Sequence, residues 1–205
     1  MKSSLFIFCF LIAAVAVGQN KSLGLFSDEA DIGKKVLKGS TTYDKKTKEY
    51  TIEGAGANIW GTHDEFHFVW KKMKGDFVVK TNGAFVGKGV ELHRKWGLMV
   101  RTSLDTSATH VNGVEHGDGL TSLQYRKASA AVTEEKKFTL THANMIQLER
   151  KGNTYIMTAT KEDGTTASEQ VEVNIGDEVY VGLFVCSHNK GVAEKAVFSK
   201  VSIGK

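Results

Sequence analysis

Short runs of alternating apolar and polar residues make up most of the chain. Segment 64–71 puts Phe66, Phe68 and Trp70 on one face and the residues between them on the other, which is the period of a β-strand. Similar runs, separated by Gly, Asn and Asp, predict strands over 41–44, 49–53, 76–86, 95–102, 119–127, 144–150, 154–160, 179–187 and 196–203. Gly152–Asn153 and Asp163–Gly164 have the composition of hairpin turns. No segment has the apolar stripe of a long helix, and 133–137 is predicted to form at most a turn. The pattern predicts an all-β, antiparallel two-sheet sandwich.

The first eighteen residues follow a different pattern. Lys2 precedes an apolar run, Leu5 to Val17, that is short for a membrane span, and residues 16–18 (AVG) match a small-x-small cleavage site. We therefore expect 1–18 to be a signal peptide that is cleaved before Gln19, and 19–205 to be a single domain. This predicts a secreted or periplasmic protein with no membrane span in its mature form.

Composition and cysteine content narrow the possibilities further. A net charge of +4 is too small to indicate nucleic-acid binding by itself, and the absence of proline excludes collagen-like and proline-rich segments. Cys9 leaves with the signal peptide, so Cys186 would be the one cysteine of the mature chain. Cys186 ends an apolar run and is predicted to be a buried strand residue and not a catalytic thiol. We expect a monomer without disulfides.

Common motifs of catalytic and cofactor sites are absent from the sequence. Segment 54–60 (GAGANIW) is glycine-rich, but it lacks the GxGxxG spacing of a dinucleotide loop. There is no GxSxG, HExxH or paired CxxC motif. The sequence therefore predicts no cofactor.

Acidic and imidazole side chains gather in segment 110–118, which we predict to be a loop. Glu115, His116 and Asp118 are sufficient for a loop metal site or for general acid and base groups. Glu115 and Asp118 are three residues apart, so on one strand they would point to opposite faces, unlike the paired carboxylates of a glycosidase. A loop that binds or shapes a site is thus favoured over a catalytic pair. Asp105 is a further oxygen ligand for calcium, but no EF-hand loop is present, and we expect no required metal.

Two arginines inside predicted strands indicate a buried polar site more directly than the acidic segment does. Arg101 and Arg126 interrupt apolar runs, and a strand arginine near a core must be paired or hydrogen-bonded. One interpretation is a salt bridge to Glu65 or Asp118. The other is a polar platform on a concave sheet that binds sugar hydroxyls, with candidate ligand-binding residues His67, Arg101, His116, Asp118, Gln124 and Arg126. Trp60 and Trp70 could add a stacking surface, although the alternation favours the core for Trp70.

A series of segments, in the same order throughout, supports a resemblance to a known superfamily. They are Gly39–Asp44 (GSTTYD), Tyr50–Trp60 (YTIEGAGANIW), Asp64–Phe68 (DEFHF), Gly75–Phe77 (GDF), Gly97–Arg101 (GLMVR), Leu148–Asn153 (LERKGN), Asp163–Gly164 and Val181–Asn189 (VGLFVCSHN). The chain resembles the concanavalin A-like lectin/glucanase superfamily from about residue 31 to 203, and in particular bacterial secreted modules of the DUF1349 type. The resemblance implies a jelly-roll sandwich.

The resemblance leaves the function open, because related families include sugar-binding modules and hydrolases. The expected function is a secreted, non-catalytic carbohydrate-binding or cell-envelope module whose partner is a glycan or polysaccharide. One alternative is a glycoside hydrolase of the glucanase or keto-disaccharide type, using Glu65, Glu115 or Asp118. Another is a scaffold for a protein partner. The paired-carboxylate strand of the glucanases is not visible in this sequence.

Overall fold

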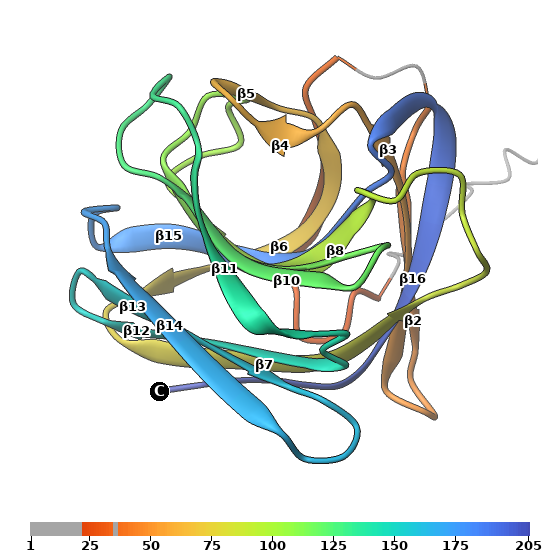
Figure 1. Cartoon of the computed structure of the whole chain (residues 1–205). Helices are drawn as coiled ribbons and strands as arrows, with labels where there is room; N and C mark the ends of the chain where they lie inside the picture. Colours follow the sequence, from red (N-terminus) through yellow and green to blue (C-terminus); the bar gives the residue numbers. More distant parts are fainter. Residues whose placement is uncertain (1–21, 35–36) are drawn as a thin grey trace, which may run out of the picture.

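The computed structural model describes residues 22–34 and 37–205, and in these ranges it contains strands, turns and loops but no helix (Figure 1). No helix in this part of the chain could span a membrane. The predicted signal peptide, residues 1–18, and the cleavage site before Gln19 lie outside the described residues.

Two seven-stranded antiparallel sheets form a sandwich, which confirms the predicted fold class. The front sheet has the order β1 (Asp28–Ile32), β6 (Phe66–Lys74), β15 (Glu178–Cys186), β8 (Lys95–Arg101), β9 (His110–His116), β10 (Leu120–Arg126) and β11 (Glu134–Thr141). The back sheet has the order β14 (Thr166–Glu172), β13 (Thr154–Thr160), β12 (Met145–Lys151), β7 (Phe77–Phe85), β16 (Asn189–Gly204), β3 (Glu49–Gly56) and β2 (Ser40–Asp44). A small hairpin, β4 (Ile59–Trp60) and β5 (His63–Asp64), lies over the inner side of the curved front sheet (Figure 1).

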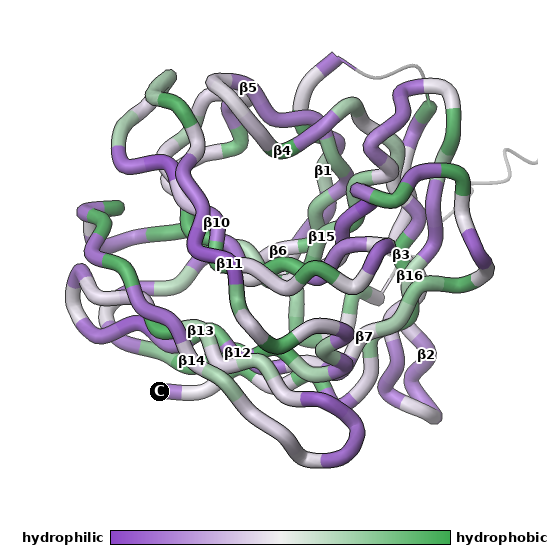
Figure 2. Tube along the Cα trace, in the orientation of Figure 1, coloured by the Kyte–Doolittle hydropathy of each residue, from purple (hydrophilic) through white to green (hydrophobic). Residues whose placement is uncertain are grey.

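The main hydrophobic core lies between the two sheets. Val69, Leu98 and Leu183 of the front sheet are fully buried there with Ile52 and Val79 of the back sheet. In Figure 2 the turn between β13 and β14 is hydrophilic, whereas hydrophobic residues recur along the strands of both sheets. Burial of this apolar area is the main stabilising term for the fold.

A second apolar cluster covers the opposite face of the front sheet. Its members are buried under the β4–β5 hairpin and neighbouring loops, and they are Ile32, Ile59, Phe66, Phe68, Met99, Val114, Phe184 and Cys186. The prediction that Cys186 is a buried strand residue is confirmed. The central strands of the front sheet are therefore buried on both faces.

Polar residues on a covered face explain the main error in the predicted elements. Segment 110–118, predicted to be a loop, is strand β9 over His110–His116, and every residue of that strand is buried. The polar residues of β9 lie on a face that is covered by other parts of the protein, so the sequence does not show the usual alternation of buried apolar and exposed polar residues.

Strands β1, β11 and β14, which were not predicted, lie at sheet edges and carry charged residues. Charged residues are common on edge strands because they oppose pairing with another chain.

Candidate binding cavity on the front sheet

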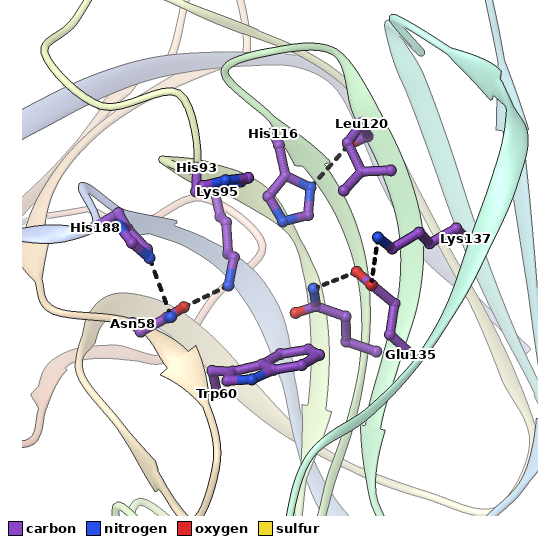
Figure 3. Close-up of a pocket in the computed structure, with 10 residues that line it drawn as sticks. Asn58, Trp60, His93, Lys95, His116, Leu120, Glu135, Lys137 and His188 are labelled. Carbon is purple, nitrogen blue, oxygen red and sulfur yellow. Dashed lines mark hydrogen bonds and ion pairs between the residues drawn. The ribbon is translucent and has the colours of Figure 1, made fainter.

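An open cavity of about 250 Å³ lies on the concave side of the front sheet, which is turned away from the back sheet (Figure 3). Strands β8, β9, β10 and β11 contribute to it from the sheet, and the β4 hairpin and loops close its other sides. The lining residues are Asn58, Trp60, His93, Lys95, His116, Leu120, Gln124, Glu135, Lys137 and His188. Here this cavity is called the front cavity.

Trp60 forms one wall of the front cavity. It is 42 % exposed, which is unusual for so large an apolar side chain. Figure 3 shows its ring beside the cavity, and the Lys95 ammonium nitrogen lies 5.8 Å from the ring centroid. The other candidate for stacking, Trp70, packs against Tyr180 at 4.7 Å between ring centroids and does not line the cavity.

Lys95 projects from the first position of β8 and is only 3 % exposed. Its ammonium group donates hydrogen bonds to Asn58 Oδ1 and, at 3.4 Å, to the carbonyl of Ile59. Asn58 is in turn 3.1 Å from His188 Nε2 through its amide nitrogen. Burial lowers the pKa of Lys95 from its ordinary value, and the nearest charged groups only partly oppose this.

His116 presents an acceptor to the front cavity. Its Nδ1 lies 2.8 Å from the carbonyl of Leu120 and donates to it, so in the neutral ring Nε2 is unprotonated. Burial, followed by the positive charge of Lys95, lowers the pKa of His116 to about 4. The ring is therefore neutral near pH 7 and accepts a hydrogen bond through Nε2.

Gln124, Glu135 and Lys137 form the opposite wall. The Gln124 amide nitrogen donates to Glu135 Oε1 at 3.0 Å, and Lys137 lies 3.7 Å from Glu135 Oε2. Gln124 is 1 % exposed, yet its amide oxygen has no hydrogen-bond partner. Buried polar atoms are nearly always paired, so this oxygen marks a position for a donor from a bound molecule or water.

Arg101 and Arg126 lie on the inner face of the front sheet, but they are paired with a different acid from the two predicted. The Arg126 guanidinium donates two hydrogen bonds to Asp64, from Nη1 to Oδ2 at 2.9 Å and from Nη2 to Oδ1 at 2.7 Å. Arg101 Nη2 is 3.4 Å from Asp64 Oδ2. The side chains of all three residues are 0 % exposed. The predicted partners Glu65 and Asp118 are therefore wrong, because β5 brings Asp64 over both arginines. This network fills the inner face next to the front cavity, and neither arginine lines the cavity.

His67 lies on the face of the front sheet opposite to the front cavity, together with Val69, so the structure does not bring it to the other candidates. Its Nδ1 is 2.7 Å from Asp31, and its Nε2 is 3.1 Å from Thr41 Oγ1 and 3.2 Å from Glu29. The expected placement of His67 on the concave platform is wrong. His67 and Val69 are two residues apart on β6 and share the face that is turned toward the back sheet.

The three carboxylates of the hydrolase alternative lie in separate environments, and none lines the front cavity. Glu65 accepts from the amide of Ala57 and pairs with Lys190 at 2.9 Å. Glu115 is buried on the inter-sheet side of β9, where Thr121 donates to it at 2.6 Å. Asp118 shapes the β9–β10 turn by accepting from the amide of Leu120. Nowhere in residues 22–34 and 37–205 do three His, Cys, Asp or Glu side chains form a group that could hold a metal.

Of the predicted ligand-binding residues, the structure places His116 and Gln124 in the front cavity. Asn58, His93, Lys95, Glu135, Lys137 and His188 were not predicted, although all of them line it. Asn58 stands two residues before Trp60 in the glycine-rich segment, which was the available signal. The others come from strand ends and loops that are far apart in the sequence.

No family model and no curated protein matches this chain. Solved structures match its fold at low identity. A functionally unknown protein from Saccharomyces cerevisiae has a TM-score of 0.61 at 13 % identity, covering 85 % of this chain and 95 % of that one. A lectin, UEA-II, described in complex with galactose, has a TM-score of 0.55 at 7 % identity, covering 87 % and 98 %. The carbohydrate-binding module CBM66 from Bacillus subtilis has a TM-score of 0.52 at 14 % identity, covering 88 % and 98 %.

These similarities define the fold class. The chain has the two-sheet β-sandwich fold of this lectin and this carbohydrate-binding module, which is the fold that the resemblance in the sequence implied. The finer resemblance to DUF1349-type modules stays a prediction.

Proposed function

We propose that this protein binds a carbohydrate in the front cavity. The observation that carries the proposal is the exposed Trp60 ring, which stands beside a set of convergent polar groups on the covered side of the front sheet (Figure 3). An aromatic wall with a few fixed polar groups is the usual composition of a small-molecule site. The lectin and carbohydrate-binding module with the same fold add support at the level of the fold only.

The polar groups suit sugar hydroxyls, which both donate and accept. His116 Nε2 and the amide oxygen of Gln124 accept hydrogen bonds, while Lys95 and the amide nitrogen of Asn58 donate. The apolar face of a sugar ring would pack on the indole of Trp60. The cavity of about 250 Å³ is slightly smaller than typical drug-sized sites, so one sugar unit would fill it and a longer chain would continue outside.

A glycan array followed by calorimetry on the best ligands tests this proposal. We expect Trp60→Ala to weaken binding by about tenfold or more, because it removes the stacking surface. Val86→Ala is the matched control, since Val86 is also an exposed apolar residue, 50 % exposed, and does not line the cavity. Val86→Ala is expected to bind as the wild type does.

The same preparations distinguish the alternatives. Absence of binding to every glycan on the array, or equal binding by Trp60→Ala and the wild type, would contradict the proposal. Release of reducing sugar from a bound oligosaccharide would instead support the hydrolase alternative.

A further inference from the structure

We propose that the carbohydrate bound in the front cavity carries an anionic group, a carboxylate or a sulfate ester, that pairs with the ammonium group of Lys95. This inference rests on the proposed function and specifies the class of ligand. The features that support it are the burial of Lys95, the neutral character of its hydrogen-bond partners and the nitrogen-rich lining of the cavity.

Lys95 is a buried cation held by neutral groups. It is 3 % exposed, and its hydrogen-bond partners are an amide oxygen and a backbone carbonyl. Among the described residues, no carboxylate lies within salt-bridge distance of its ammonium nitrogen, whereas the buried Arg94 pairs with Glu194 at 2.7 Å and Arg126 with Asp64 at 2.7 Å. A buried charge is costly without a counter-charge, so a counter-charge is expected to come from a ligand.

The one carboxylate among the lining residues is already engaged. Glu135 accepts from Gln124 and lies 3.7 Å from Lys137, on the wall across from Lys95. Asp118 Oδ2 lies 3.9 Å from His93 Nδ1, and Asp118 does not line the cavity. An anion that enters the cavity therefore meets Lys95 without displacing an existing ion pair.

Histidine rings complete a lining that is rich in nitrogen. The ring centroids of His93 and His188 are 5.7 Å apart, and those of His93 and His116 are 6.1 Å apart. Burial is the largest factor that lowers the pKa of Lys95, and the same factor lowers that of His188. A bound anion would oppose both shifts, because it favours the charged form of each group.

Lysine is a compact point charge and does not impose the two-pronged geometry of arginine. The site is therefore expected to accept either a uronic-acid carboxylate or a sulfate ester, provided that the ring carrying it stacks on Trp60. A neutral sugar would bring no counter-charge to Lys95. We therefore expect the site to select anionic over neutral carbohydrates.

Matched ligands test the inference directly. Calorimetry would compare galacturonic-acid and galactose oligosaccharides of equal length, and a sulfated galactan oligosaccharide with its desulfated form. Where the wild type binds one of these pairs, we expect the anionic member to bind about tenfold to a hundredfold more tightly, as for a charge-assisted hydrogen bond. Lys95→Met is expected to abolish this preference. Lys127→Met, a lysine that is 54 % exposed outside the cavity, is expected to retain it.

The outcomes separate this inference from the proposed function. If neutral glycans bind at Trp60 as tightly as their anionic partners, or if Lys95→Met keeps the preference, the anionic ligand is wrong while carbohydrate binding stands. If no glycan of either kind binds, the proposed function fails and this inference fails with it. The wild-type comparison decides the point even if Lys95→Met does not fold.

Discussion

At the scale of single residues, buried ionisable groups set the pH response of this protein. Glu115 is 4 % exposed on the inter-sheet side of β9, and burial raises its pKa to about 8. His116, the next residue, lies on the other face of the strand, and its pKa is lowered to about 4. Each group is therefore kept in its neutral form near pH 7, which is the usual response of a buried group to its surroundings.

Glu115→Gln is expected to be more stable than the wild type at pH 8 and nearly equal to it at pH 4.5. In the wild type, the folded state holds a proton on Glu115 between the unfolded value of 4.5 and the folded value of about 8. The free energy of unfolding therefore falls as pH rises through this window, by at most ~1.4 kcal/mol per pH unit. Urea unfolding of both proteins at the two pH values measures the difference.

The control for this prediction is Glu172→Gln, which changes an exposed carboxylate of β14. It should shift the unfolding free energy by less than about 0.5 kcal/mol at either pH. A constant difference between Glu115→Gln and the wild type across the pH range would show that Glu115 is not protonated in the folded state.

At the scale of elements, close contact between the sheets depends on a glycine opposite a tryptophan. Trp96 of β8 is 1 % exposed and meets Phe198 of β16 at 5.7 Å between ring centroids. A Cβ atom on Gly83 of β7 would lie 2.4 Å from the Trp96 ring. The two sheets can therefore approach at this point because β7 presents no side chain there.

Gly83→Ala is expected to destabilise the fold by about 1–3 kcal/mol, since the added methyl group forces Trp96 or the sheets to move. Gly204→Ala in β16 is the matched control, because its added Cβ would meet no atom within 4 Å. Thermal unfolding, with near-ultraviolet circular dichroism to follow the tryptophan environment, compares the two. Equal melting temperatures for both variants would show that Trp96 rearranges without cost.

The predicted elements were accurate where the residues of a strand are mostly apolar or alternate, including strands β8 and β15, which are buried on both faces, and inaccurate where a strand carries many polar residues. The alternation of 64–71 placed Phe66, Phe68 and Trp70 correctly on one face, and the turns at 152–153 and 163–164 join consecutive strands. Strand β9 was missed because His110, Asn112 and His116 face a covered polar surface on which residue type does not indicate burial.

At the scale of the whole molecule, the described part of the chain contains one cysteine, the buried Cys186, and no disulfide. Stability in this part comes from the two apolar clusters on either side of the front sheet. Export of the chain stays a prediction from the first eighteen residues.

We expect the exported protein to begin at Gln19 and to melt at the same temperature with and without a thiol reductant. Mass spectrometry of the exported chain gives its N-terminus, and a thiol assay under denaturant should find one thiol, where the uncleaved precursor would show the thiols of both Cys9 and Cys186. An intact N-terminus in the cytosol, or a melting temperature that falls in reductant, would contradict the prediction.

The sequence by itself determined the all-β sandwich, the faces of several strands and the burial of Cys186, because alternation and turn composition are local properties of the chain. Only the tertiary structure decided that Asp64 pairs with both Arg101 and Arg126, that His67 faces the back sheet, and which side chains form the front cavity. The cavity joins residues 58–60, 93–95, 116–124, 135–137 and 188 from five separate segments. Their proximity follows from strand order and sheet curvature, which depend on contacts between residues far apart in the sequence and leave no local pattern.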